Sequence, residues 1–210
     1  MSESGNAAQL PALRLKRNED RRLQAGHLWV FSNEVDAGQT PLPKFKPGEL
    51  VRVLAHNDRA LGLAYVNPKS LISARMLETW SVPDAAWFAE RIRIALLLRE
   101  RLYREPYYRL VYGESDGLPG LVIDRYGDYY TIQTLDQGMD RAKGEILSAL
   151  EALFLPRGIA ERNDVAVRKR GTAFAVRGGF RRGSRDDRGA YERPHAACRS
   201  AARAENRNLP

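Results

Sequence analysis

The segment GESDGLPGLVIDRYGD at residues 113–128 constrains the fold of this chain more than any other part of its sequence. Its glycines permit positive φ angles or close backbone approach, and Pro119 fixes one φ between them. We therefore expect Glu114 and Asp116 on a shaped turn. The apolar residues 121–123 then form a run that is typical of a buried strand. The segment predicts a tight connection that leads into a sheet.

Short apolar runs separated by turn residues predict several closely spaced strands in the first part of the chain. The expected strands cover residues 12–17, 28–31, 49–55, 60–66 and 71–77. Asn18 is expected to cap a short helical turn that Gly26 ends, and residues 36–47 have the composition of a loop. Many short strands at this spacing favour a small β-barrel.

The second part of the chain adds helices to strands. Asp84 is expected to cap a long helix that continues to Leu98, and a second helix is expected from Met139 to Phe154. Pro156 and Gly158 would close this second helix.

The expected strands of this part flank the glycine-rich segment. One strand covers residues 109–112, and residues 121–123 belong to the next. Residues 126–129 would form a tight turn that connects this strand to its hairpin partner at residues 130–135. Strands and helices in this mixture indicate a small α+β domain, so the predicted fold class is mixed α/β (α+β).

Changes in composition divide the chain into four predicted parts. They are a flexible start at residues 1–10, a β-barrel at 11–80, an α+β domain at 81–170 and a tail at 171–210. The tail shows neither helical nor strand periodicity and is expected to be largely disordered.

Most of the net charge of +8 belongs to the tail. Nine arginines and four acids after residue 170 contribute +5, so residues 1–170 carry +3. Two explanations of the tail stay open. It is either a nucleic-acid tether that acts through arginine, or an out-of-frame product, because the folded pattern breaks off abruptly. We favour the second, which sequencing of the coding DNA would decide.

One cysteine, Cys198, excludes an internal disulfide and suits a reducing compartment. No apolar run approaches the roughly 20 residues that span a bilayer, and the start lacks the pattern of a signal peptide. We therefore expect a cytoplasmic protein without a membrane partner.

Cations and aromatic residues alternate near the start of the chain, which suits RNA because they offer phosphate contacts and stacking surfaces. The candidate RNA-binding residues are Arg14, Lys16, Arg17, Arg21, Arg22, His27 and Trp29. The competing interpretation makes Trp29 and Phe31 core residues, and we expect this of at least one of them. His27 by itself is as compatible with a structural role as with a contact.

The acids of the glycine-rich region allow two interpretations. Glu114, Asp116 and Asp124 could bind a divalent cation, but no histidine lies nearby and the spacing matches no calcium loop. We favour hydrogen bonds from glycine amides or neighbouring arginines that hold the loop in one shape.

Three stretches of sequence resemble one family, in the same order and over roughly residues 10 to 170. They are LRLKR with GHLWVFS within residues 13–32, the segment at 113–128, and ERNDVAVRK at 161–169. They resemble the PUA-like module, the central domain and the connector to the catalytic domain of the ribosomal RNA large subunit methyltransferase I family. Its members use S-adenosylmethionine to methylate carbon 5 of a cytosine in 23S ribosomal RNA.

The resemblance implies a PUA-like barrel, ribosomal RNA as a partner, and a substrate cleft shaped by the glycine-rich region. The cleft-shaping residues would be Gly113, Glu114, Asp116, Gly117, Gly120, Asp124 and Arg125. Residues 1–170 lack the strand-glycine-helix signature of the family's cofactor site, and Cys198 lacks the proline-containing context of the catalytic cysteine. We therefore expect this chain to bind no S-adenosylmethionine and to transfer no methyl group. A homodimer is left open.

Two other classes of function stay open from the residues alone. One is a general nucleic-acid-binding module that acts through the arginine-rich tail, and the other is a small metal-dependent enzyme that uses Glu114, Asp116 and Asp124.

Overall fold

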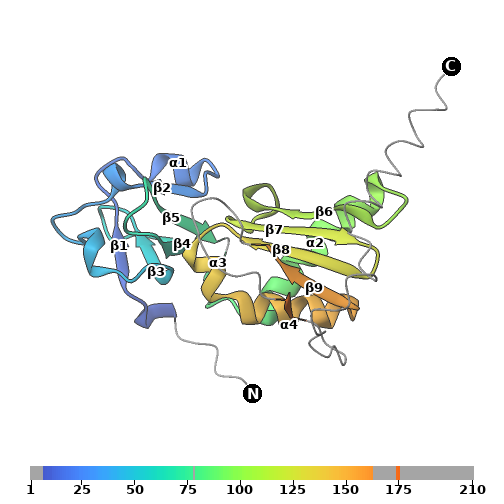
Figure 1. The fold of residues 1–210 in the computed structure, drawn as a ribbon. Coiled ribbons are helices and arrows are strands. Elements are labelled where there is room, and N and C mark those ends of the chain that lie inside the picture. Colours follow the sequence, from blue (N-terminus) through green and yellow to red (C-terminus); the bar gives the residue numbers. More distant parts are fainter. Residues whose placement is uncertain (1–6, 78, 163–173, 176–210) are drawn as a thin grey trace. The chain divides into compact units, whose positions relative to one another are not determined.

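The chain forms two β-sheets, with helices packed on the second (Figure 1). The computed structural model describes residues 7–77, 79–162 and 174–175. The architecture is mixed α/β, which confirms the predicted fold class. Most of the predicted flexible start and almost all of the predicted tail, including Cys198, lie outside the described residues. Among the start's described residues, Ala7–Gln9 form a 3-10 helix, η1.

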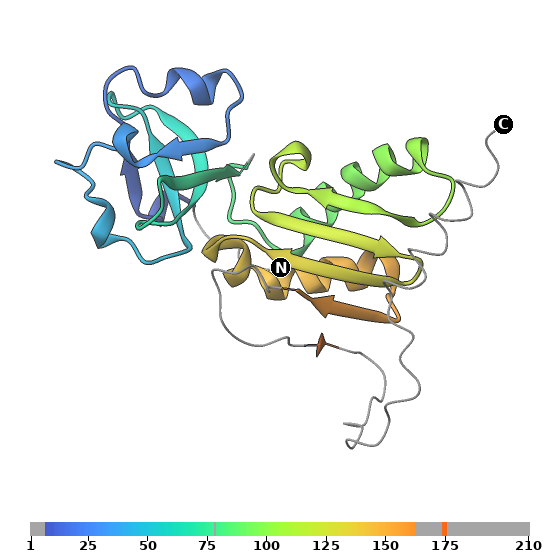
Figure 2. The same ribbon diagram turned by 45° about the horizontal axis from the view of Figure 1, so that its top comes forward.

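The first sheet is curled into a half-barrel (Figure 2) and has the strand order β1-β3-β4-β5-β2. Its strands are β1 (Ala12–Arg14), β2 (Trp29–Phe31), β3 (Glu49–Leu54), β4 (Ala60–Val66) and β5 (Ile72–Leu77). All five predicted strands are therefore present. β1 runs parallel to β3, and the other pairs are antiparallel. Alternate residues such as Leu13, Val30 and Val51 fill its core.

Short helical segments connect these strands. They are α1 (Arg21–Gln24) and the 3-10 helices η2 (Ser32–Glu34) and η3 (Leu42–Lys44). Asn18 does not cap α1, because its φ of 68° places it in a left-handed turn before the helix, and Asp20 occupies the cap position. Gly26 follows the helix with a φ of +91°, as the sequence predicts.

The second sheet has the order β10-β9-β8-β7-β6, with β8 parallel to β9 and the other pairs antiparallel. Its strands are β6 (Tyr107–Tyr112), β7 (Leu121–Tyr126), β8 (Tyr129–Thr134), β9 (Gly158–Glu161) and β10 (Phe174–Ala175). The β7–β8 hairpin turns where the sequence predicts it, since Tyr126 pairs with Tyr129.

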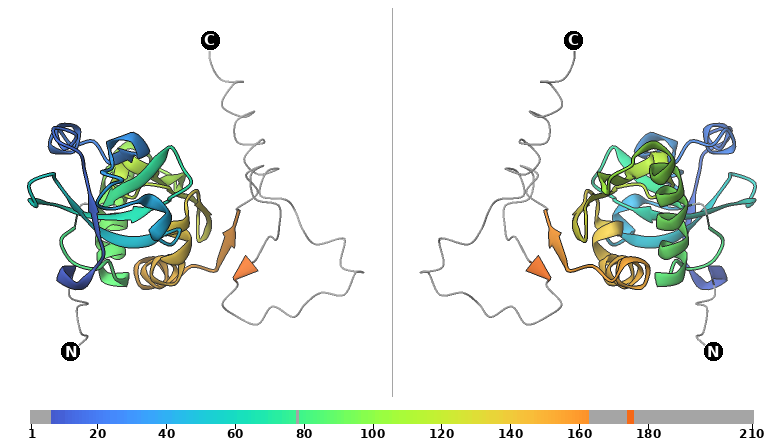
Figure 3. Two further views of the ribbon diagram at one scale, coloured as in Figure 1. Left: turned by 90° about the vertical axis from the view of Figure 1, so that its left-hand side faces the viewer. Right: turned by 90° about the vertical axis from the view of Figure 1, so that its right-hand side faces the viewer.

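Three helices accompany this sheet. They are α2 (Ala85–Leu102), α3 (Gln137–Arg141) and α4 (Lys143–Phe154). Phe88 and Ile92 of α2 and Ile146 of α4 share one core with the buried face of the sheet. Figure 3 shows α4 leading into β9, which completes the crossover from β8.

The helix boundaries confirm one prediction and correct another. The Asp84 side chain accepts a hydrogen bond from the Trp87 amide at 2.8 Å, so Asp84 caps α2 as expected. The predicted second helix is instead two helices that meet at Ala142. Leu155, with a left-handed φ of 46°, ends α4, whereas Gly158 already belongs to β9.

Candidate nucleic-acid interface

One row of side chains crosses the first sheet from edge to middle. Trp29 of β2 pairs with Arg75 of β5, Arg75 pairs with Tyr65 of β4, and Tyr65 pairs with Leu50 of β3. Cross-strand partners point to the same face of a sheet, so these four side chains share the face opposite Val30. Tyr65 and Leu50 pack into the core that contains α2 and β6–β8. This row therefore joins the first sheet to the rest of the described fold.

Trp29 and Arg75 both reach Glu114 of the glycine-rich segment. The Trp29 indole Nε1 donates to Glu114 Oε1 at 2.7 Å, and Arg75 Nε lies 3.8 Å from the same oxygen. The Trp29 side chain remains 37% exposed. Phe31 lies edge-on to it at 6.3 Å and is half-buried. The prediction that at least one of these two aromatics is a core residue is wrong, because the core residue of β2 is Val30, whose side chain points to the face opposite Trp29.

Asp136 lies at the same junction and is almost completely buried, with 3% of its side chain exposed. Its Oδ1 accepts the Met139 amide at 2.9 Å and caps α3, while Oδ2 has no hydrogen-bond partner and lies 3.6 Å from Arg75 Nε. Burial raises the pKa of Asp136. A Cβ on Gly120 would lie 2.1 Å from this oxygen, so only glycine fits there.

Neither Arg75 nor Asp136 was singled out from the sequence. Arg75 lies inside an apolar strand, and only its register opposite Trp29 brings it to the junction. Asp136 could have been found from the sequence, because aspartate is a favoured residue at the N-cap position, directly before the first residue of a helix.

The α3 helix is seated on the first sheet through two glycines. A Cβ on Gly138 would lie 2.2 Å from Tyr65 Cγ, and a Cβ on Gly48 would lie 2.4 Å from the Gln137 carbonyl oxygen. Only glycine lets the backbone at residue 138 approach the Tyr65 side chain, and the backbone at residue 48 approach that of Gln137, this closely.

The crossover from β8 through α3 and α4 to β9 is a strand-helix-strand unit that sequence reasoning missed. In cofactor sites of this kind, glycines after the strand leave room for the ligand. Here the space beside Gly138 is filled by the Tyr65 ring, and the buried Asp136 carboxylate occupies the strand end. This unit therefore does not fit S-adenosylmethionine.

Asp116 accepts three hydrogen bonds that hold the glycine-rich turn. Arg99 of α2 donates to both carboxylate oxygens at 2.7 and 2.6 Å, and the Tyr112 amide donates at 2.6 Å. The turn is the 3-10 helix η4 (Gly113–Asp116), and Gly113 and Gly117 adopt positive φ angles of 56° and 69° at its two ends. The favoured interpretation named glycine amides or neighbouring arginines as the donors, and for Asp116 the donors are the arginine Arg99 and the Tyr112 amide.

The three candidate acids do not converge on one point. Glu114 faces Trp29, Asp116 faces Arg99, and the Asp124 carboxylate accepts from Arg109 Nε at 2.8 Å. In residues 7–77 and 79–162, no group of three or more metal-ligating side chains could hold an ion. The geometry therefore offers no support for the metal-dependent alternative.

The predicted cleft-shaping residues separate into three places. Gly113, Glu114 and Gly120 lie at the junction, and Asp116 and Gly117 lie against α2. Asp124 and Arg125 follow one another in β7 and point to opposite faces of the second sheet, where Arg125 Nη1 donates to the Tyr108 hydroxyl at 3.0 Å.

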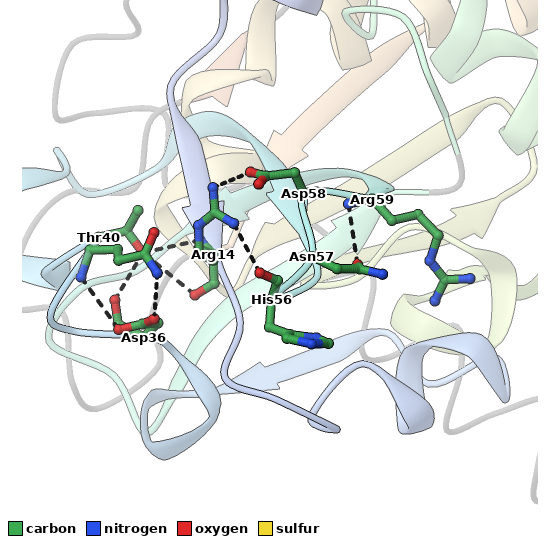
Figure 4. A network of polar contacts seen from close by, with 8 residues as sticks. Arg14, Asp36, Thr40, His56, Asn57, Asp58 and Arg59 are labelled. Carbon is green, nitrogen blue, oxygen red and sulfur yellow. Dashed lines mark hydrogen bonds and ion pairs between the residues drawn. The ribbon is translucent and has the colours of Figure 1, made fainter.

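Three of the predicted RNA-binding cations are engaged within the fold. Figure 4 shows the Arg14 guanidinium between the Asp36–Thr40 loop and the His56–Arg59 turn, where it donates to the His56 carbonyl at 3.2 Å and pairs with Asp58. The hydrogen bond with Asp58 raises the pKa of Arg14.

The other two engaged cations are Lys16, which lies between β1 and α1, and Arg22, which lies in α1. Lys16 Nζ donates to the Asn33 carbonyl at 2.7 Å, and Arg22 pairs with the buried Glu34 at 2.9 Å. The Arg22 guanidinium also lies 4.9 Å from the centre of the Phe31 ring.

Arg17, Arg21 and His27 are exposed. Within the described part of the chain, neither Arg17 nor Arg21 forms an ion pair, so both guanidinium groups can meet a phosphate. Together with the exposed part of Trp29, they form what we define as the amino-terminal basic surface: Arg17, Arg21, His27 and Trp29.

Sequence comparison shows which known proteins this chain resembles. Residues 13–79 match the family model described as a PUA-like domain. Ribosomal RNA large subunit methyltransferase I from Cronobacter sakazakii is 36% identical over 161 residues, which cover 74% of this chain and 40% of the relative. The enzyme of the same name from Vibrio cholerae is 39% identical over 165 residues, which cover 76% and 41%.

A solved structure supports the fold. A candidate SAM-dependent methyltransferase from Streptococcus mutans superposes with a TM-score of 0.62 at 18% identity and covers 73% of this chain and 40% of that chain. No helix among the described residues has the length and apolarity needed to cross a membrane. The chain spans about two-fifths of the length of the curated relatives it matches. Residues 13–79 match a PUA-like domain, and the chain is similar to the amino-terminal part of ribosomal RNA large subunit methyltransferase I.

Proposed function

We propose that this chain is the RNA-binding part of a ribosomal RNA methyltransferase and that it holds ribosomal RNA on its PUA-like domain. The observation that carries this proposal is the amino-terminal basic surface. Two unpaired arginines and an exposed tryptophan lie within the residues that match the PUA-like family. Phosphates are bound by such cations, and unstacked bases by such rings.

We divide the seven predicted RNA-binding residues between two proposed roles. We propose that Arg17, Arg21, His27 and Trp29 contact RNA. Arg14, Lys16 and Arg22 would instead support the surface, because their cationic groups are already bound to carbonyl or carboxylate oxygens.

We propose that residues 11–80 and 81–170 are two domains and that the second positions the substrate. Methyl transfer would not come from the described residues, because the crossover at Gly138 does not fit S-adenosylmethionine. Carbon 5 of cytosine becomes nucleophilic through addition of a cysteine, and Cys198 lies outside the described residues. A ribosomal RNA partner also supports a cytoplasmic location.

The test is equilibrium binding of the chain to a fragment of 23S ribosomal RNA over a series of salt concentrations. Reversing both charges in Arg17→Glu/Arg21→Glu should weaken binding and should lower the slope of log affinity against log salt by about 2, roughly 1 per lost phosphate contact. A matched control is Arg101→Glu, which reverses an exposed arginine on α2 and should leave the slope nearly unchanged.

Two further measurements address the alternatives. If binding depends on the tail, truncation after Arg170 removes most of it, and the basic surface is then not the RNA site. Incubation with labelled S-adenosylmethionine and ribosomal RNA should incorporate no methyl group. Analytical ultracentrifugation of the same samples decides between a monomer and a homodimer.

A further inference from the structure

The second sheet has one face covered by helices and another that carries tyrosines. No helix among the described residues covers this second face, and we propose that it is a second RNA-binding surface, which stacks unpaired bases. The proposal rests on the proposed function in that the ligand is RNA, but it concerns different residues. We define the tyrosine face by its outward residues: Tyr107, Arg109, Tyr112, Tyr126, Tyr129 and Arg157.

The strand register places three of these tyrosines side by side. Tyr107 of β6 pairs with Tyr126 of β7, and Tyr126 pairs with Tyr129 of β8. The Cβ atoms of cross-strand partners lie about 5 Å apart, so the three side chains start side by side on one face of the sheet. Tyr108 and Tyr130, their neighbours in sequence, point to the opposite face and are buried.

Three of the four tyrosines on this face are exposed to solvent, whereas Tyr126 is half-buried. Tyr107 is 64% exposed, Tyr112 is 56% exposed and Tyr129 is 52% exposed. Several exposed aromatic rings on one surface commonly mark an interaction site. A tyrosine ring has few rotatable bonds, so it loses little entropy when a partner covers it.

One glycine and one arginine hold the Tyr129 ring in place. Gly158 of β9 lies opposite Tyr129, and a Cβ there would be 3.2 Å from the ring, so the ring rests directly on the backbone. The guanidinium of Arg157 lies 5.9 Å from the Tyr129 ring centre. A ring supported in this way is preorganised for stacking, which reduces the entropy cost of binding.

A second arginine extends the face along the sheet. The Arg109 guanidinium lies 5.1 Å from the Tyr112 ring centre, and its Nε donates a hydrogen bond to Asp124 Oδ1 at 2.8 Å. Because Asp124 already balances this charge, Arg109 contributes mainly a flat surface. Arg157 is also exposed and forms no ion pair among the described residues. Binding on the tyrosine face should therefore depend on stacking more than on phosphate contacts.

The types of side chain on the tyrosine face favour RNA over protein as its partner. Exposed Ile94, Leu97 and Leu98 on α2 form an aliphatic patch of the kind that packs against protein. The tyrosine face instead combines aromatic rings, guanidinium planes and hydroxyl groups, which suit bases that are free to stack. A single-stranded segment of RNA fits these groups better than a duplex, because paired bases do not expose their faces.

The experiment compares two double variants of the full chain in binding to a short, unstructured, fluorescein-labelled RNA. Tyr107→Ser/Tyr129→Ser should weaken binding by about tenfold or more, since each stacked base contributes substantially to affinity. The salt slope should not change, in contrast to Arg17→Glu/Arg21→Glu. Tyr107→Phe/Tyr129→Phe retains the rings and should bind within about twofold of the unaltered chain.

A matched control removes exposed apolar area elsewhere. Leu97→Ser/Leu98→Ser on α2 should leave RNA affinity unchanged. Thermal unfolding of every variant shows whether it is folded. If the serine variant is unfolded, ultraviolet crosslinking of the unaltered chain to thiouridine-labelled RNA takes its place, with crosslinks expected at Tyr107 or Tyr129.

The outcomes separate this inference from the proposed function. If the unaltered chain binds RNA and the serine variant binds equally well, the tyrosine face is not an RNA site, and a protein partner becomes its better explanation. Crosslinks found only on the amino-terminal basic surface would overturn the inference in the same way while leaving the proposed function in place. If the unaltered chain binds no RNA, both proposals are wrong.

Discussion

The Arg99 guanidinium and the Asp116 carboxylate form a buried two-pronged ion pair, with side chains only 11% and 5% exposed. Arg99 also donates to the Arg109 carbonyl at 3.1 Å, and Asp116 accepts the Tyr112 amide. The pair thus connects α2 and β6 to the glycine-rich turn. Removing one partner would leave the other charge buried without compensation.

Arg99→Met should therefore destabilise the fold by about 3–5 kcal/mol in chemical denaturation. A matched control is Asp124→Asn, which breaks the more exposed pair with Arg109 and should cost about 0–1 kcal/mol. If Arg99→Met costs no more than the control, the buried pair does not organise the turn.

Gly138 and Gly144 offer a matched comparison within neighbouring helices. An alanine methyl at Gly138 would lie 2.2 Å from Tyr65 Cγ, whereas nothing lies within 4 Å of one at Gly144. Gly144→Ala should stabilise the protein by about 0.5–1 kcal/mol through helix propensity. Gly138→Ala should destabilise it by at least about 1–3 kcal/mol, because the core is overpacked. Equal effects on the melting temperature would show that α3 is not seated on Tyr65.

The hydrogen bond between Trp29 and Glu114 can be measured with a double-mutant cycle. Trp29→Phe and Glu114→Gln should each destabilise the fold, and their coupling free energy should be about 1 kcal/mol, as for a hydrogen bond to a charged group near the surface. Denaturation of the four proteins gives this value. A coupling near zero would mean that Glu114 does not hold the indole in solution.

Asp136 should give the stability a defined dependence on pH. Burial raises its pKa in the folded state above the ordinary value of 3.8, so the folded chain holds this proton more tightly than the unfolded chain. Its contribution is fully present below pH 3.8 and is lost as the pH rises through the raised value. Asp136→Asn removes this titration while Glu114 and Arg75 remain.

The measurement is the free energy of unfolding of both proteins at several pH values from about 4 to about 7. The stability of the unaltered chain relative to Asp136→Asn should fall as the pH rises. A relative stability that rises with pH would show that Arg75 lowers the pKa of Asp136 more than burial raises it.

The local pattern of the sequence was sufficient to predict most elements. Short apolar runs between turn residues predicted the strands around Val51 and Leu63, and Asp84 at the start of an apolar periodicity predicted α2. The spacing around Gly127 predicted the β7–β8 hairpin. These features depend on neighbours in sequence, because strand alternation, helix caps and tight turns are set by a few adjacent residues.

The sequence by itself therefore determined most of the elements, the fold class and the resemblance of residues 113–128 to a family segment, but not β9 or the division between α3 and α4. Only the tertiary structure decided which cations are engaged and which are exposed, since Arg14 meets Asp58 across 44 residues and Trp29 meets Glu114 across 85. Those pairings follow from strand register and from the packing of α3 on Tyr65, which are long-range properties that no local pattern encodes.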